Sequence, residues 1–194
     1  LAADNADQAV YWMRERGLAG FRFHPMYYPD EAVLLRRAND ALWDQLAAGA
    51  AVVQFHLRAA QAEQVAQLAV RYPRLRLIVD HLGYPDPRAG IETYAPILAL
   101  ARFANVHVKV SDVAGRSREG FPFADVHPFI RALLRAFGSD RLMWGTGYPG
   151  HHRARHKWPS LADELRLVRE GLPFLNATDR DRILGRTAAA VWGL

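Results

Sequence analysis

Five short apolar runs, separated by longer amphipathic segments, constrain what this 194-residue chain can fold into. The runs are rich in β-branched and aromatic residues, which is typical of buried strands. Strands that alternate with helices form βαβ units, with a parallel sheet and right-handed connections. The predicted strands cover residues 20–24, 51–57, 75–81, 106–111 and 141–144.

The predicted helices lie between these strands and after the last one. Asp30 is a candidate N-cap for the second helix, and Gly49 ends it. Two architectures fit this order of elements: a doubly wound open sheet, or part of a (β/α)8 barrel. A complete barrel typically needs about 250 residues, more than this chain has. The predicted helices cover residues 8–16, 31–48, 59–71, 94–103, 125–137, 160–170 and 179–192.

The composition narrows the classes of function. The absence of cysteine excludes a disulfide-built scaffold, a cysteine-ligated metal centre and a thiol nucleophile. A net charge of +5 favours a small anionic ligand, with nucleic acid as the rival and a coding bias toward arginine as the alternative that needs no ligand. We expect no nucleic-acid partner, because the basic run 151–156 has no interleaved aromatic residues. With neither a signal peptide nor a membrane span recognised, we expect a cytoplasmic protein.

Three histidines, His24, His56 and His81, lie at the ends of three successive predicted strands. Parallel α/β proteins place their active sites there. Imidazole is both a common metal ligand and an acid or base near neutral pH, so His56 and His81 are the predicted catalytic pair. They are also the predicted ligands of a divalent metal such as Zn²⁺ or Mn²⁺, with a metal-independent site as the alternative. His24 is a predicted substrate contact, and the structural alternative for each is a buried histidine bonded to a local carbonyl.

Two basic residues accompany the histidines. Arg22 alternates with two phenylalanines and so faces the opposite side of its strand. It is predicted to hold a substrate carboxylate, and a salt bridge at the barrel rim is the equal alternative. Lys109 is a predicted substrate contact, or a structural cation paired with a carboxylate. Because adjacent strand residues face opposite ways, His81 is predicted to face the pocket and Asp80 to bond the neighbouring backbone.

A glycine-rich turn, 145–150, and a basic run follow the last predicted strand. Tyr148, His151 and His152 are predicted to bind the substrate at the mouth of the site. The turn lacks the spacing of a P-loop or of a dinucleotide fingerprint, so its phosphate-binding signal is weak. A solvated basic loop is the structural alternative.

Short motifs at the strand ends resemble, as an ordered set, those of amidohydrolase family 2, whose members are (β/α)8 barrels and include lactone hydrolases. The resemblance covers essentially the whole chain. It implies one domain over 1–194, a partial TIM barrel of about five βα units that corresponds to the carboxyl-terminal two thirds of the family barrel and lacks its first strands. The matching motifs are Gly20-Phe-Arg-Phe-His24, Val53-Gln-Phe-His56, Val79-Asp-His-Leu-Gly83, Val108-Lys-Val-Ser111, Arg141-Leu-Met-Trp-Gly-Thr-Gly-Tyr-Pro149 and Ile183-Leu-Gly-Arg-Thr-Ala188.

The resemblance also implies an activity, the hydrolysis of a lactone or related ester or amide in a small acidic or sugar-derived molecule. In it, His81 corresponds to a strand-six histidine beside the substrate or metal. His56 corresponds to a metal ligand at the end of strand five, and Arg22 to an arginine that contacts acidic substrates.

One position departs from the family pattern. The last strand of the family usually ends Gly-Thr-Asp-Tyr-Pro, and its aspartate acts as metal ligand or base, whereas this chain has Gly147 there. Glycine has no proton acceptor, so hydrolysis would require another base, for which His151 and His152 are the candidates. A catalytically inactive ligand-binding or scaffold relative is the alternative. A sheet that does not close leaves strand edges that invite pairing, and we therefore expect a homo-oligomer.

Overall fold

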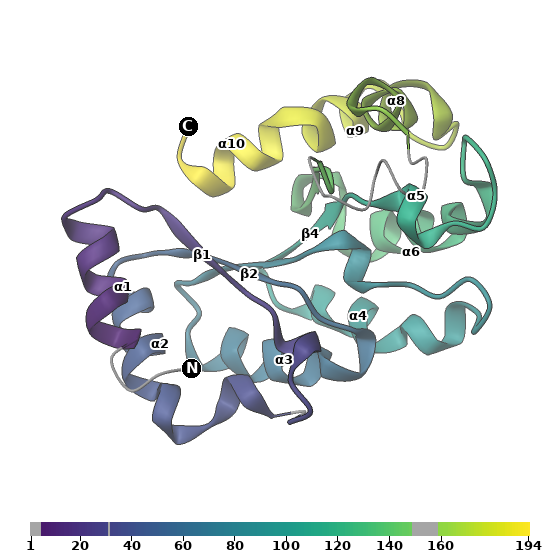
Figure 1. Cartoon of the computed structure of the whole chain (residues 1–194). Helices are drawn as coiled ribbons and strands as arrows, with labels where there is room; N and C mark the ends of the chain where they lie inside the picture. Colours follow the sequence, from purple (N-terminus) through teal and green to yellow (C-terminus); the bar gives the residue numbers. More distant parts are fainter. Residues whose placement is uncertain (1–4, 31, 149–158) are drawn as a thin grey trace.

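The strands lie side by side in the same order as they occur in the sequence. A computed structural model describes residues 5–30, 32–148 and 159–194. Its strands form one parallel sheet in the order β1-β2-β3-β4-β5 (Figure 1). A doubly wound sheet would reverse its strand order part-way, so this order is that of a barrel segment. The strands are β1 (Gly20–Phe23), β2 (Val52–Phe55), β3 (Arg76–Val79), β4 (Val106–Val110) and β5 (Leu142–Trp144).

The helices lie on two sides of this sheet. Figure 1 shows α1 to α4 on one side and α8 to α10 on the other. No helix in the described ranges is both long enough and apolar enough to span a membrane. The helices are α1 (Asn5–Arg14), α2 (Asp40–Ala48), α3 (Ala62–Arg71), α4 (Ala95–Ala99), α5 (Val113–Arg116), α6 (His127–Phe137), α8 (Leu161–Arg166), α9 (Ala177–Asp181) and α10 (Thr187–Trp192).

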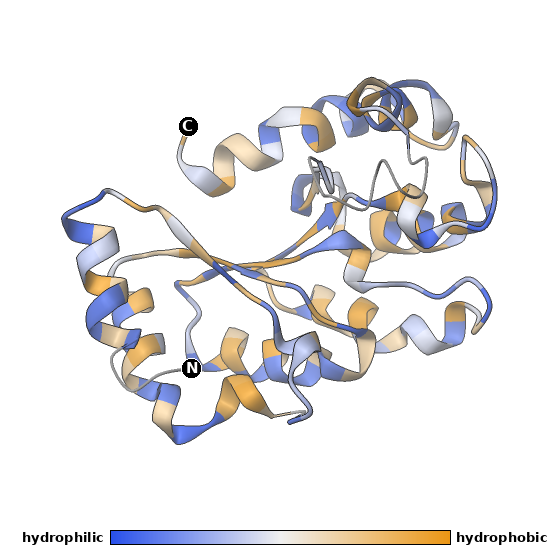
Figure 2. Ribbon diagram, viewed as in Figure 1, coloured by the Kyte–Doolittle hydropathy of each residue, from blue (hydrophilic) through white to orange (hydrophobic). Residues whose placement is uncertain are grey.

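Each face of the sheet has its own apolar core, because successive strand residues point to opposite faces. Residues such as Val53 and Val79 pack on one face with the apolar sides of α2, α3 and α6. Figure 2 shows hydrophobic residues along the strands and on the neighbouring helices. On the other face, a smaller core joins Val52, Ile78 and Met143 to α10. Thus α10 covers this face of the sheet near the amino-terminal ends of the strands. The part of the face near the carboxyl-terminal ends of the strands is left for polar groups.

The predicted helix over 31–48 is wrong in its first part. Residues Val33–Leu35 and Arg37–Asn39 form two 3-10 turns, and α2 begins only at Asp40. Here side chains, rather than the i to i−4 hydrogen bonds of an α-helix, pair with the backbone amide and carbonyl groups. Gln64 Oε1 accepts from the Leu34 amide at 2.8 Å, and Trp43 Nε1 donates to the Leu34 carbonyl at 2.8 Å.

The other predicted helices differ mainly in their boundaries. The segment 94–103 contains α4 between two 3-10 turns, Ile91–Tyr94 and Leu100–Arg102. The last two segments contain the π-helical turns Leu167–Gly171 and Arg182–Arg186. Helix α5, directly after β4, was not predicted, because four residues are too few for a helical period to show.

Gly20 is where β1 meets α10. A Cβ at this position would collide with the Val52 carbonyl oxygen and lie 2.9 Å from Trp192 Cζ3. We therefore expect Gly20→Ala to lower the free energy of unfolding by about 2 kcal/mol, measured by urea titration. The control is Gly120→Ala, whose Cβ would meet nothing within 4 Å and which we expect to change stability by less than about 0.5 kcal/mol. Equal effects of the two substitutions would contradict the close packing of β1 against α10.

Candidate active site

A buried carboxylate lies between two cations at the carboxyl ends of the strands. Asp80, directly after β3, is 1% exposed. Arg22 Nε donates to its Oδ2 oxygen, and Lys109 Nζ lies 3.1 Å from its Oδ1 oxygen. Lys109 also donates to Gln54 Oε1, and Gln54 is the register partner of Arg22 across β1 and β2. Four neighbouring strands therefore contribute to one charged cluster.

The charges in this cluster keep Asp80 ionised. Burial raises the pKa of its carboxyl, but the positive charges of Lys109 and Arg22 outweigh that effect and hold the pKa below its ordinary value. The two cations still reach solvent, since the side chain of Arg22 is 38% exposed and that of Lys109 is 23% exposed. The cluster therefore presents net positive charge to a ligand.

The prediction that Asp80 bonds the neighbouring backbone is wrong. It assumed that the alternation of the strand continues through His81, but β3 ends at Val79. His81 then takes a left-handed backbone conformation, with φ +50°, at the start of a tight turn. This change of direction brings Asp80 and His81 to the same cluster.

The contacts of His81 determine which of its nitrogens carries the proton. Its Nε2 lies 3.1 Å from Arg22 Nη2, and its Nδ1 lies 3.0 Å from Ser111 Oγ. A guanidinium only donates, so Nε2 is the acceptor and the neutral ring carries its proton on Nδ1, which donates to Ser111. Burial, opposed by Asp80 and aided by Arg22 and Lys109, lowers the pKa of His81 to about 4. His81 is therefore neutral at pH 7.

His56 is the middle of a second polar chain. Its Nδ1 lies 3.1 Å from His24 Nδ1, and its Nε2 lies 2.5 Å from the Tyr84 hydroxyl. Burial, followed by the charges of His81, Arg22 and His24, lowers the pKa of His56 to about 4. Burial, then Arg22, also lowers the pKa of His24. These two hydrogen bonds can both run from Tyr84 toward His24 or both run the other way. The row Tyr84, His56 and His24 is therefore a path for one proton.

In the described arrangement, His56 and His81 offer no free ring nitrogen to a divalent metal. Both ring nitrogens of His56 and of His81 bond to other protein groups. Two cations, Arg22 and Lys109, lie beside them. Among residues 5–30, 32–148 and 159–194, no group of three histidine, aspartate or glutamate side chains is placed to hold a metal. The role of His56 and His81 as metal ligands stays a prediction.

The remaining predicted residues belong to the turn after β5 and to the segment that follows it. Tyr148 follows β5 and is 57% exposed, so its contact with substrate stays a prediction. His151 and His152 lie outside the described residues. Gly147 lies in the turn after β5 and brings no side chain to the site.

Sequence reasoning missed several polar members of the cluster. Besides Asp80, these are Tyr84 and Ser111. Ser111 comes two residues after Lys109, so the period of a strand places both on one face. Tyr84 carries no such signal, because only the left-handed turn after β3 brings its hydroxyl back to His56.

Comparison with known proteins decides the family. The family model Amidohydro_2, described as amidohydrolase, matches residues 2–194. The chain belongs to amidohydrolase family 2. The predicted fold, a partial (β/α)8 barrel, is confirmed by likeness to a zinc-bound amidohydrolase of Burkholderia multivorans, with a TM-score of 0.84 and 24% identity. That likeness covers 100% of this chain and 70% of the amidohydrolase.

Two curated relatives of the present chain are named as lactone-hydrolysing enzymes. The chain is 36% identical over 132 residues to an L-fucono-1,5-lactonase of Burkholderia ambifaria, covering 66% of this chain and 43% of that protein. It is 30% identical over 122 residues to a 4-sulfomuconolactone hydrolase of Rhizobium radiobacter, covering 61% of this chain and 40% of that protein. The matches thus span less than half the length of these relatives.

Removal of the buried carboxylate tests the charged cluster. Breaking a buried ion pair costs about 3–5 kcal/mol, and because Arg22 reaches solvent we expect Asp80→Asn to cost about 2 kcal/mol of unfolding free energy. Urea titration measures the loss. The control is Asp140→Asn at an exposed position, expected to cost less than about 0.5 kcal/mol. A loss no larger for Asp80→Asn than for the control would contradict the account of the cluster.

The pKa values of the histidines predict a pH dependence of stability. His56 and His81 have pKa values of about 4 in the fold, below the ordinary value of 6.5, so the unfolded chain binds more protons between these values. Stability should therefore fall as pH decreases from 6.5 to 4. The double variant His56→Asn, His81→Asn should show a shallower fall in urea unfolding over this range. Parallel curves for the variant and the parent chain would contradict the lowered pKa values.

Proposed function

We propose that this amidohydrolase hydrolyses a lactone, or a related ester or amide, in a small acidic or sugar-derived molecule. The observation that carries the proposal is the neutral His81, held beside Arg22 and Lys109 at the carboxyl ends of the strands. This arrangement offers a proton acceptor next to two positive charges. Those are the groups that attack of water on a carbonyl needs.

The charges support an anionic substrate. Arg22 uses Nε and Nη2 in bonds to Asp80 and His81, so within the described chain its other guanidinium hydrogens remain for a ligand. Guanidinium groups bind carboxylates through two parallel bonds. Lys109 adds a second, partly exposed positive charge. The names of the two relatives, a sugar lactonase and a sulfonated muconolactone hydrolase, support this class of substrate.

The described residues suffice for each proton transfer. Arg22 Nη2 first releases His81 Nε2 and turns to the substrate. A water molecule at the freed Nε2 then gives up a proton to it as its oxygen attacks the lactone carbonyl carbon. Arg22 and Lys109 stabilise the oxyanion of the tetrahedral intermediate. The ring C–O bond then breaks, and the leaving oxygen takes the proton of the Tyr84 hydroxyl, which the path through His56 and His24 replaces. The product is the open-chain hydroxy acid, and His81 returns its proton to solvent.

Gly147 favours a second candidate function. The family's usual carboxylate is absent at this position, so a relative that binds an anionic ligand without turning it over would carry the same charged cluster. In that case Arg22 and Lys109 bind the ligand, and the histidines keep a structural role.

Proton release on incubation with carboxylated and sugar lactones tests the proposal. We expect the chain to turn over at least one of them, and His81→Asn to lower kcat about 10²–10⁴-fold through loss of the proton acceptor. The control is His127→Asn, which should keep the parent rate. In the described structure, the ring of His127 forms a hydrogen bond with the Pro122 carbonyl. Circular dichroism verifies that each variant is folded.

Two results would contradict this reading. Turnover that appears only in Gly147→Asp would establish the second candidate, a binding protein that lost its base. A parent rate that EDTA abolishes and Zn²⁺ or Mn²⁺ restores would assign the proton transfer to a metal-bound water rather than to His81. Turnover that resists EDTA and is lost in His81→Asn is the expected outcome.

A further inference from the structure

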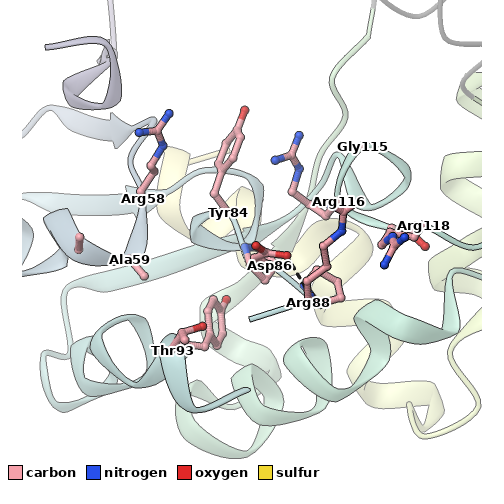
Figure 3. Close-up of a pocket in the computed structure, with 14 residues that line it drawn as sticks. Arg58, Ala59, Tyr84, Asp86, Arg88, Thr93, Gly115, Arg116 and Arg118 are labelled. Atoms are coloured by element: carbon pink, nitrogen blue, oxygen red, sulfur yellow. Dashed lines mark hydrogen bonds between the residues drawn. The ribbon is translucent and has the colours of Figure 1, made fainter. Parts of the chain in front are cut away.

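An arginine-lined groove lies beside the candidate active site. Its volume is about 670 Å³, and the segments that follow β2, β3 and β4 form its walls. Figure 3 shows Arg58 and Arg116 on either side of Tyr84, with Arg88 and Arg118 further along. Among the described residues that line the groove, Asp86 is the only acidic one. Four arginines against one aspartate leave a net charge of +3.

The arginines of this groove are poorly neutralised. In the described part of the chain, Arg58, Arg88 and Arg118 are exposed and form none of the ion pairs. Asp86 offsets only one of the four positive charges, and its Oδ1 accepts a hydrogen bond from the backbone amide of Arg88 at 2.9 Å. Four cations around one groove repel each other, so a bound anion would stabilise the arrangement.

Arg116 is the most firmly placed of the four. Its Nη2 lies 3.6 Å from Asp112 Oδ2, and its guanidinium lies 4.1 Å from the centre of the Tyr84 ring. Its Nε is buried and has no hydrogen-bond partner among the residues that the structure describes.

The groove shares one residue, Tyr84, with the proposed reaction and is otherwise separate from the reacting groups. Tyr84 is the shared wall: its hydroxyl bonds His56, and its ring lies beneath Arg116. Neither Arg22, His81 nor Lys109 lines the groove. A ligand bound in it would therefore touch the proton path only through Tyr84.

We propose that this groove binds a phosphate-type oxyanion, carried by a phosphorylated or pyrophosphorylated small molecule. Each guanidinium holds two oxygens in a planar fork, and four of them exceed what one carboxylate can occupy. A phosphate monoester carries about −1.5 to −2 charge at pH 7, so two phosphoryl groups match the charge of the groove. The volume lies within the range of about 300–1,000 Å³ that small-molecule sites occupy.

Calorimetric titration with inorganic pyrophosphate at low ionic strength tests the proposal. We expect binding that weakens with added salt, and at least tenfold weaker binding by the triple variant Arg58→Gln, Arg88→Gln, Arg118→Gln. The matched control removes three exposed arginines from other surfaces, Arg14→Gln, Arg74→Gln and Arg169→Gln. It has the same net charge as the groove variant and should bind like the parent chain.

Three outcomes would overturn the proposal. One is no binding by the folded parent chain at millimolar pyrophosphate, and another is equal loss in both triple variants, which would indicate unspecific attraction. The third is loss of binding in Arg22→Gln with retention in the groove variant, which would place the anion at the reaction centre. None of these measurements requires turnover, so they are independent of the lactone hydrolysis proposed above.

Discussion

The carboxylate of Asp80 is buried at the end of β3, and removing such a charge from water costs several kcal/mol unless partners compensate it. Arg22 and Lys109 provide that compensation from strands on either side. The need to compensate this charge fixes the position of Arg22. The Arg22 guanidinium donates to His81 Nε2, so the proton of the His81 ring lies on Nδ1. One buried charge therefore organises the cation pair, the tautomer of a histidine and the hydrogen bond to Ser111.

The barrel geometry places this charge where chemistry is possible. Parallel strands in register bring residues of one face to the same level, so Arg22 and Gln54 lie side by side. On the same face, α10 covers the amino-terminal half with apolar contacts to Val52, Ile78 and Met143. The carboxyl-terminal half is left for charged and polar side chains. This face of the sheet is therefore apolar near the amino-terminal ends of the strands and polar near their carboxyl-terminal ends. The boundary follows from the length of each strand and from the position of α10.

Periodicity predicted five strands in a parallel sheet, with three histidines at their ends. It left the strand order open between a doubly wound sheet and a barrel segment, and the family resemblance indicated the barrel. It failed where tertiary contacts decide, since the start of α2 depends on Gln64 and Trp43, which satisfy the backbone from elsewhere. It also failed at Asp80, whose direction depends on a strand that ends at Val79 and on a left-handed turn at His81. A sequence pattern carries the period of a strand but not the residue at which that period stops.

The state of His81 is the most direct test of this account. Long-range proton–nitrogen correlation NMR reports which ring nitrogens carry protons, and the assignment uses the loss of the signals in His81→Asn. At pH 7 we predict a neutral ring protonated on Nδ1 and bare on Nε2, and it should stay neutral to about one unit above its pKa of about 4. A ring protonated on Nε2, or charged at pH 7, would contradict the arrangement of Asp80, Arg22 and His81.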